Sequence, residues 1–329
     1  NGLSPAASSR PPQSTMAPVT DMSHEQRLWE LAEGIKPSQP ENEGVVTPEI
    51  LERMRNMMKG EAINMVQKSE IQVAPRRLGN GVFADVFSGT YRNQTVAVKR
   101  LLADTIDEEI IQDFCSEVTI LSKVRHPNIV EYVGTCLEDL SIITELVEGA
   151  NLFQILRKAG KPLDWRNCRH VALGVAQGVA YLHNCVPPVV HRDLKSLNVL
   201  IGHSAQIKLC DFGLALFKRL KAISTQRAAG SPAWMAPEIL QGKEFDEMAD
   251  VYSYSVVLWE MLSGKIPWDD KDNMQIVALV GYRARRLPLP AVPPAGYPPR
   301  FIQLIQDCWS HEPRNRPTFS QMVSILQSL

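Results

Sequence analysis

The stretch His191-Arg192-Asp193-Leu194-Lys195-Ser196-Leu197-Asn198 is followed, after a short predicted hairpin, by Asp211-Phe212-Gly213. It places two carboxylates, one amide and one lysine on two loops separated by that hairpin. Phosphoryl transfer needs such a set, because a carboxylate must accept the proton of the attacking hydroxyl while a carboxylate and an amide hold Mg²⁺ on the phosphates. The alternative, an exposed polar loop beside a turn, does not require these residue types at these offsets.

This stretch resembles the catalytic and metal-binding loops of the eukaryotic protein kinases. The resemblance implies that Asp193 is the catalytic base and that Lys195 neutralises charge on the transferred γ-phosphoryl of ATP. It also implies that Asn198 and Asp211 bind Mg²⁺. The fold class expected from it is α+β, the bilobal protein kinase fold. A small antiparallel β lobe carries one helix, and the larger lobe is mostly α-helical.

A glycine-containing turn lies upstream, between strands predicted at 72–78 and 82–91. Residues 79–86 resemble the kinase glycine-rich loop, whose backbone N–H groups approach the phosphates. Strands on both sides argue against a dinucleotide-binding motif, because a helix follows the glycines there. Ala84 replaces the third glycine of the pattern, and an alanine forced into a glycine conformation would cost about 1–2 kcal/mol. We therefore expect weaker nucleotide binding but intact chemistry.

The motif Val96-Ala97-Val98-Lys99 lies on a third predicted strand. The resemblance implies that Lys99 contacts the α- and β-phosphates and that Glu117, on a helix predicted at 107–124, pairs with Lys99. Thr144-Glu145-Leu146-Val147 resembles the gatekeeper and hinge, whose backbone binds the adenine edge. The residues predicted to bind the nucleotide are Gly79, Asn80, Gly81, Val86, Ala97, Lys99, Thr144, Glu145, Val147 and Leu200.

The resemblance covers about residues 70–329, with its motifs in the correct order. Asp211–Glu238 resembles an activation segment. Asp250 heads a very apolar predicted helix and needs partners there; the resemblance implies that it caps backbone of the catalytic loop. Arg316 matches the arginine that pairs with the carboxylate at Glu238.

Two features bear on the substrate. Lys195 is typical of serine/threonine kinases, whereas Ala233–Glu238 resembles the substrate platform of tyrosine kinases. This mixture resembles the tyrosine-kinase-like group, which includes Raf-like and mixed-lineage kinases, so we predict serine/threonine specificity and leave dual specificity open. A non-catalytic scaffold is disfavoured because Lys99, Asp193 and Asp211 are all present. The full activation segment disfavours a small-molecule phosphotransferase.

Three hydroxyls in the activation segment are candidate regulatory sites, namely Ser224, Thr225 and Ser231. Phosphorylation by an upstream kinase or by the protein itself would add negative charge, which Arg192 is placed to pair with. The alternative is that Ser224 and Thr225 are ordinary loop residues. Ser231 is better explained by a role in shaping the substrate platform.

The chain divides into four predicted parts. Residues 1–20 form a disordered tail, since they are rich in Pro, Ser and Ala and poor in large apolar side chains. Residues 21–69 form a helical extension, followed by the small lobe (about 70–146) and the large lobe (about 147–329).

The extension contains two predicted helices, one at 23–34 and one that begins at Thr47-Pro48, with Pro48 at its first position. Apolar residues follow at helical spacing in the second helix, namely Ile50, Leu51, Met54, Met57 and Met58. One interpretation is a helix that packs on the neighbouring domain, and the other is a regulatory or dimerising segment. The oligomeric state is left open.

The composition of the chain limits the class of protein and the partners to be expected. A chain of 329 residues with net charge −1 and 44% hydrophobic residues is ordinary globular protein, and it gives no electrostatic reason to expect nucleic acid as a partner. No apolar run spans a bilayer. The chain begins at Asn1 rather than Met, so we expect a fragment and leave an upstream anchor open.

The six cysteines are scattered without a CxxC pair, which disfavours zinc and indicates a reducing, cytoplasmic compartment. Cys210 directly precedes Asp211 and is expected to border the nucleotide pocket. It is either accessible to electrophiles there or a buried, inert thiol.

Overall fold

The computed structural model describes residues 46–80, 84–102, 108–211 and 232–329. All of these belong to one compact unit, Gln39–Leu329. Several predictions concern residues outside the described ranges, namely the disordered tail, the helix at 23–34, Gly81, Ser224, Thr225 and Ser231.

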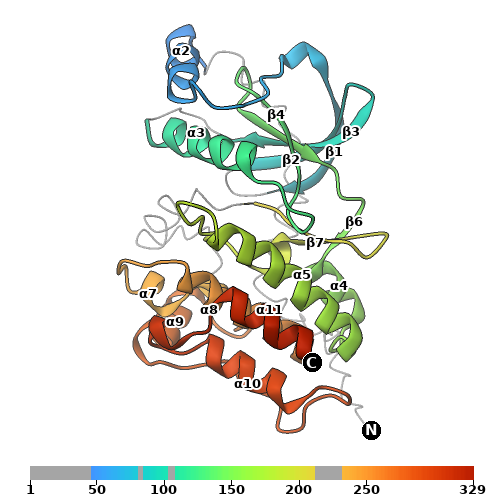
Figure 1. Cartoon of the computed structure of the whole chain (residues 1–329), viewed down its shortest axis with the longest axis vertical. Helices are drawn as coiled ribbons and strands as arrows, with labels where there is room; N and C mark the ends of the chain where they lie inside the picture. Colours follow the sequence, from blue (N-terminus) through green and yellow to red (C-terminus); the bar gives the residue numbers. More distant parts are fainter. Residues whose placement is uncertain (1–45, 81–83, 103–107, 212–231) are drawn as a thin grey trace, which may run out of the picture. The chain divides into compact units, whose positions relative to one another are not determined.

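A five-stranded antiparallel sheet occupies the first part of the described chain (Figure 1). Its strands are β1 (Ile71–Asn80), β2 (Ala84–Tyr91), β3 (Gln94–Leu101), β4 (Tyr132–Cys136) and β5 (Ser141–Glu145), in the order β1-β2-β3-β5-β4. The strands predicted around the glycine turn and at Lys99 are confirmed. Arg92 and Asn93 connect β2 to β3 with φ of 47° and 63°, as a two-residue type I′ turn requires.

The two faces of this sheet have different surroundings. Val96 and Val98 of β3 are buried in a cluster with Tyr91, Ile143 and Val66. Because side chains alternate along a strand, the residues between and after these valines, Ala97 and Lys99, point to the opposite face. That face lines the cavity described below.

Two helices accompany the sheet. α3 (Glu108–Lys123) confirms the helix predicted at 107–124. α2 (Pro48–Met57) begins as predicted, with Thr47 as N-cap and Pro48 at its first position. It contacts α3, so the interpretation that this helix packs on the neighbouring domain is confirmed.

Ala84 does not adopt a glycine conformation. It begins β2 opposite Leu101 of β3, and it is not among the non-glycine residues with positive φ. The predicted strain of about 1–2 kcal/mol was wrong, because strand pairing holds this residue in extended backbone that any residue adopts.

The rest of the described chain is mostly helical. A small sheet contains β6 (Gly149–Asn151), β7 (Val199–Gly202) and β8 (Ile207–Leu209). The helices are α4 (Leu152–Ala159), α5 (Trp165–His183), α7 (Pro237–Leu240), α8 (Met248–Ser263), α9 (Asn273–Ile276), a π-helical turn (Val277–Tyr282), α10 (Pro299–Cys308) and α11 (Phe319–Ser328).

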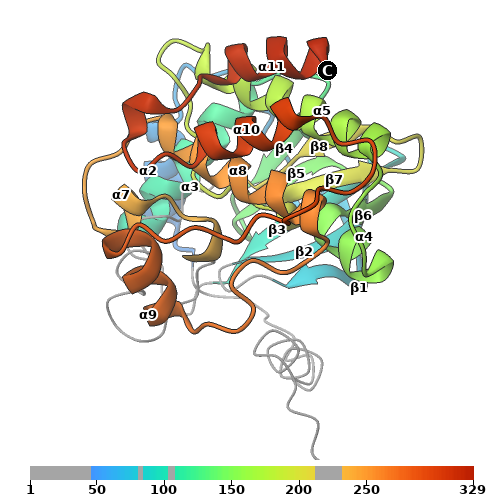
Figure 2. The same ribbon diagram turned by 90° about the horizontal axis from the view of Figure 1, so that it is seen from below.

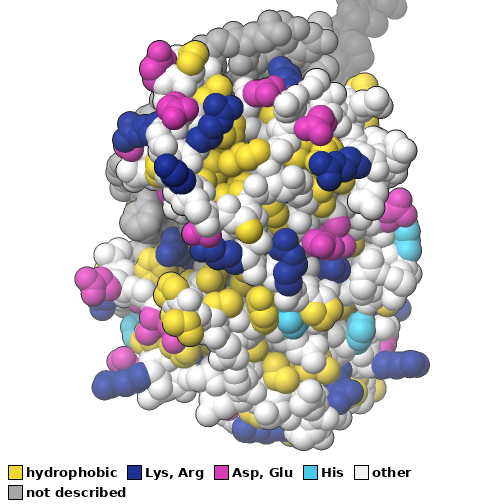
Figure 3. Space-filling view, turned by 45° about the horizontal axis from the view of Figure 1, so that its top comes forward, with side chains coloured by type: hydrophobic (Ala, Val, Ile, Leu, Met, Phe, Trp, Pro, Cys, Tyr) yellow, Lys and Arg dark blue, Asp and Glu magenta, His cyan; other side chains and the backbone are white. Residues whose placement is uncertain are grey.

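α8 is the centre of this helical part. Its residues from Ala249 to Leu262 are all buried, and α5 and α10 pack against it, while α11 packs on α5 (Figure 2). The small β lobe with its helix and the mostly helical second part confirm the predicted α+β fold. None of the described helices is long and apolar enough to cross a membrane. On the face drawn in Figure 3, Lys and Arg side chains are interspersed with Asp and Glu.

Candidate active site

A cavity of about 410 Å³ lies at the inner face of the five-stranded sheet, beside β7. This volume is in the range of small-molecule sites. It brings together most of the residues predicted to bind the nucleotide, namely Gly79, Val86, Ala97, Lys99, Thr144, Glu145, Val147 and Leu200. Asn80 ends β1 opposite Asp85. Leu78, Leu121, Val130 and Ile142 complete the apolar wall, and sequence reasoning had not assigned them.

Lys99 lies between two carboxylates inside this cavity. Its Nζ is 2.8 Å from Glu117 Oε1 and 3.1 Å from Asp211 Oδ1. Burial opposes the charged form of Lys99, but Asp211 and Glu117 outweigh it and raise its pKa. Lys99 lowers the pKa of Asp211, whereas burial raises that of Glu117. The arrangement therefore presents a cation and an ionised carboxylate to whatever occupies the cavity.

Asp193, Lys195 and Asn198 form a second group. Lys195 Nζ lies 3.0 Å from Asp193 Oδ2. The Asn198 side-chain amide donates to Asp193 Oδ2 at 2.9 Å and to the Asp193 carbonyl at 2.8 Å. These contacts fix the orientation of the Asp193 carboxylate, and they turn the amide oxygen of Asn198 away from it.

The two loops that carry these groups have unusual backbone. Arg192 and Asp211 have φ of 66° and 55°, which costs a non-glycine residue energy and is concentrated at functional sites. Asp250 Oδ2 and Oδ1 accept the backbone N–H groups of His191 and Arg192 at 2.7 and 2.9 Å. His183 adds a 2.8 Å contact to the same carboxylate. The predicted cap of the catalytic loop by Asp250 is confirmed.

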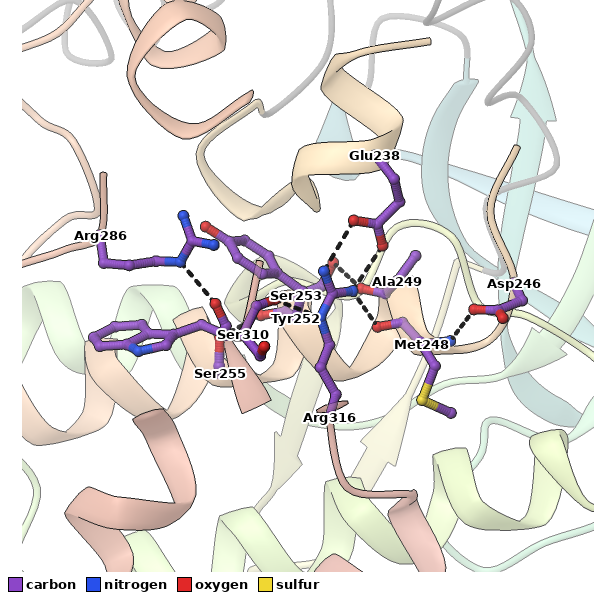
Figure 4. Close-up of polar contacts among 11 residues, drawn as sticks. Glu238, Asp246, Met248, Ala249, Tyr252, Ser253, Ser255, Arg286, Ser310 and Arg316 are labelled. Atoms are coloured by element: carbon purple, nitrogen blue, oxygen red, sulfur yellow. Dashed lines mark hydrogen bonds and ion pairs between the residues drawn. The ribbon is translucent and has the colours of Figure 1, made fainter. Parts of the chain in front are cut away.

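Glu238 and Arg316 form a buried pair (Figure 4). The two guanidinium NH groups donate to the two carboxylate oxygens at 2.7 and 2.9 Å. Arg316 also donates to the carbonyls of Met248 and Ser310, at 2.8 and 2.9 Å. The predicted pairing is confirmed, and it holds α7 against the start of α8.

Glu260 was missed by sequence reasoning. It is fully buried in α8, where it accepts hydrogen bonds from Ser196 Oγ at 2.7 Å and Trp234 Nε1 at 2.8 Å. It thus connects the loop of Asp193 with the segment that resembles a substrate platform. A glutamate inside an almost wholly apolar helix was the signal, because a buried carboxylate needs partners.

Glu145 has a side-chain role in addition to the predicted backbone one. Its carboxylate accepts the backbone N–H of Glu131 at 2.8 Å and forms an ion pair with Lys208 of β8. The end of β5 is thereby connected to the residue that precedes β4 and to β8.

Cys210 borders the cavity, as expected. Its backbone N–H donates to the Asn198 carbonyl at 3.1 Å. Burial, with the nearby carboxylate of Asp211, raises the pKa of its thiol well above the usual value. The raised pKa of the thiol therefore favours the inert thiol over the reactive one.

Comparison with known proteins agrees with this geometry. The family model described as protein tyrosine and serine/threonine kinase matches residues 72–326. The chain belongs to this family. The predicted kinase fold and the tyrosine-kinase-like group are confirmed.

Kinases of this family from a plant and an amoeba are similar to the chain. The probable serine/threonine-protein kinase SIS8 of Arabidopsis thaliana is 39% identical over 255 residues, which are 77% of this chain and 24% of the relative. Serine/threonine-protein kinase CTR1 of the same plant is 39% identical over 257 residues, covering 77% and 31%. The probable serine/threonine-protein kinase drkC of Dictyostelium discoideum is 39% identical over 272 residues, covering 81% and 36%. The chain thus spans between a quarter and about a third of these relatives.

Proposed function

We propose that this protein is a serine/threonine kinase that transfers the γ-phosphoryl group of ATP to protein substrates. The observation that carries the proposal is the position of Asp193. Asn198 and Lys195 hold its carboxylate within electrostatic reach of Asp211, which lines the cavity together with Lys99. The relatives named above as serine/threonine-protein kinases support serine and threonine hydroxyls of the substrate as the acceptors.

The proposed roles follow from charge and position. Asp193 accepts the proton of the attacking hydroxyl, and Lys195 offsets charge that develops on the transferred group. Lys99, held by Glu117, binds the nucleotide phosphates. A positioned base contributes about 10²–10⁴-fold to the rate, and positioning with charge stabilisation supplies most of the remainder in phosphoryl transfer.

Mg²⁺ fits the oxygen donors that Asp211 and Asn198 supply. Asp211 supplies an ionised carboxylate, and the Asn198 amide oxygen is turned away from Asp193. Both are oxygen ligands of the kind that Mg²⁺ takes, and it commonly uses one or two protein ligands together with substrate phosphates. The described residues contain no group of three or more His, Cys, Asp or Glu side chains that could hold a metal. When bound, Mg²⁺ would neutralise phosphate charge.

Regulation and location are further parts of the proposal. Phosphorylation of Ser224 or Thr225, by an upstream kinase or by the protein itself, would add charge to the activation segment, while Ser231 shapes the platform. All six cysteines are free thiols, which supports a reducing, cytoplasmic compartment.

The test is transfer of radiolabelled phosphate from Mg-ATP to the protein and to a generic protein substrate, followed by phosphoamino-acid analysis. Label on serine and threonine that disappears in Asp193→Ala supports the proposal. Label on tyrosine as well indicates dual specificity. ATP binding without transfer, in protein with acidic replacements at Ser224 and Thr225, indicates a non-catalytic scaffold.

A further inference from the structure

Residues 48–68 precede the segment that matches the kinase family, yet they are built into the small lobe. We call them the strap. They contain α2 and the extended chain that follows it. Figures 1 and 2 show α2 beside α3, and the two helices are in contact.

Apolar side chains of the strap and of α3 are buried in one core cluster. Met54 and Met58 are 0% and 3% exposed and belong to the same core cluster as Ile111 and Phe114 of α3. Met57, on the same helix, is 43% exposed. Burial of the two methionines is the larger attraction, because exposed polar contacts contribute less.

Ion pairs connect the strap to both ends of α3. Arg53 pairs with Glu108, the first residue of α3, and Glu61 pairs with Lys123, its last residue. Each of these four side chains is at least 30% exposed, so each pair is weak alone. Together they define where the strap lies along the helix.

The other end of the strap is fixed to β4, the edge strand of the sheet. Val66 N–H donates to the Thr135 carbonyl, and Thr135 N–H donates to the Asn64 carbonyl, both at 2.9 Å. The Asn64 side chain donates to the Val133 carbonyl at 2.7 Å. The approach depends on Gly134, because a Cβ there would lie 2.6 Å from Val66 Cγ2. The strap thus covers the open edge of the sheet and connects that edge with α3.

The position of α3 determines the ion pair in the cavity. Glu117 lies on α3, and Lys99 lies on β3. Their 2.8 Å contact persists only while the helix stays against the sheet. We propose that the strap holds α3 in this position, so that Met54 and Met58 are positioning residues for phosphate transfer. This inference rests on the kinase function proposed above.

The experiment compares Met54→Ala with Met57→Ala in the full chain. Amide hydrogen exchange is measured in α3 (108–123) and in α8 (248–263), because local opening and global unfolding differ in which amides lose protection. We expect Met54→Ala to lower protection in α3 about tenfold, with α8 unchanged, and to lower kcat about tenfold, which corresponds to about 1.4 kcal/mol. Met57→Ala should change neither. Equal loss of protection in α3 and α8, or no loss in α3, would overturn the inference.

A second pair of variants avoids any loss of core packing. Arg53→Glu places a like charge opposite Glu108 at an exposed site, and we expect α3 protection and kcat to fall about twofold to fivefold. The exchanged pair Arg53→Glu/Glu108→Arg should restore both; failure to restore would also overturn the inference. If the wild-type protein transfers no phosphate but α3 responds as stated, the strap is supported and the kinase function is rejected. The two proposals therefore fail in different ways.

Discussion

Replacing Arg316 by Met tests the buried pair with Glu238. The arginine side chain is 0% exposed and the glutamate side chain 8%, so the change leaves a carboxylate without its partner in the interior. Removing one member of such a pair costs about 3–5 kcal/mol, and the carbonyls of Met248 and Ser310 lose their donors as well. We expect a loss of at least about 3 kcal/mol in the free energy of unfolding. Domains are stable by only about 5–15 kcal/mol, so this is a large fraction.

The assay is equilibrium unfolding in urea, monitored by tryptophan fluorescence. The matched control is Arg314→Met, because the Arg314 side chain is 82% exposed and its 3.5 Å pair with Glu312 is exposed as well; its loss should cost less than about 1 kcal/mol. The double variant Arg316→Met/Glu238→Leu should recover part of the stability, since no buried charge remains unpaired. A loss below about 1 kcal/mol for Arg316→Met, or a double variant whose losses simply add, would refute this reasoning.

Three further predictions concern His126 and two residues that line the cavity, Glu117 and Cys210. Glu117→Gln removes one charged partner of Lys99 and should lower kcat about tenfold or more; unchanged kcat would contradict the role of the pair. His126 has a pKa lowered by burial and by Lys208, so the unfolded chain gains this proton first and stability falls as the pH drops below about 6.5. The stability difference between wild type and His126→Asn should therefore shrink between pH 7 and 5, by at most about 1.4 kcal/mol per pH unit, and a constant difference in urea titrations would reject this. The Cys210 thiol should react with iodoacetamide at least about tenfold more slowly than free cysteine and more slowly still with ATP present; fast labelling indifferent to ATP would place it outside the cavity.

The sequence predicted the parts of the site that depend on short spacing. The motif at 191–198 and the strand of Lys99 carry their residue types at fixed offsets. The structure brings Asp193, Lys195 and Asn198 into contact and places Lys99 in the cavity with Asp211. The helix of Glu117 was predictable from its apolar period. These elements are local, so their side-chain pattern is visible in the chain itself.

The rest depends on contacts between distant residues. Val66 pairs with Thr135 of β4. No local sequence pattern indicates that these two distant segments lie against each other. The apolar neighbours of Glu260 in the sequence indicate that this carboxylate needs hydrogen-bond partners. They do not indicate that the partners are Ser196 and Trp234. The backbone strain at Ala84 was predicted from the glycine pattern alone, whereas the pairing of Ala84 with β3 determines its backbone conformation.

The measurement that tests the central claim most directly is single-turnover phosphate transfer at saturating Mg-ATP by wild-type protein and by Asp193→Asn. The substitution preserves the shape of the side chain that Asn198 and Lys195 hold but removes its capacity as a base. We predict a rate about 10²–10⁴-fold lower, with ATP affinity and thermal midpoint unchanged. A variant whose rate stays within about threefold of wild type, well short of the contribution of a positioned base, would contradict the assignment of Asp193 and with it the proposed mechanism.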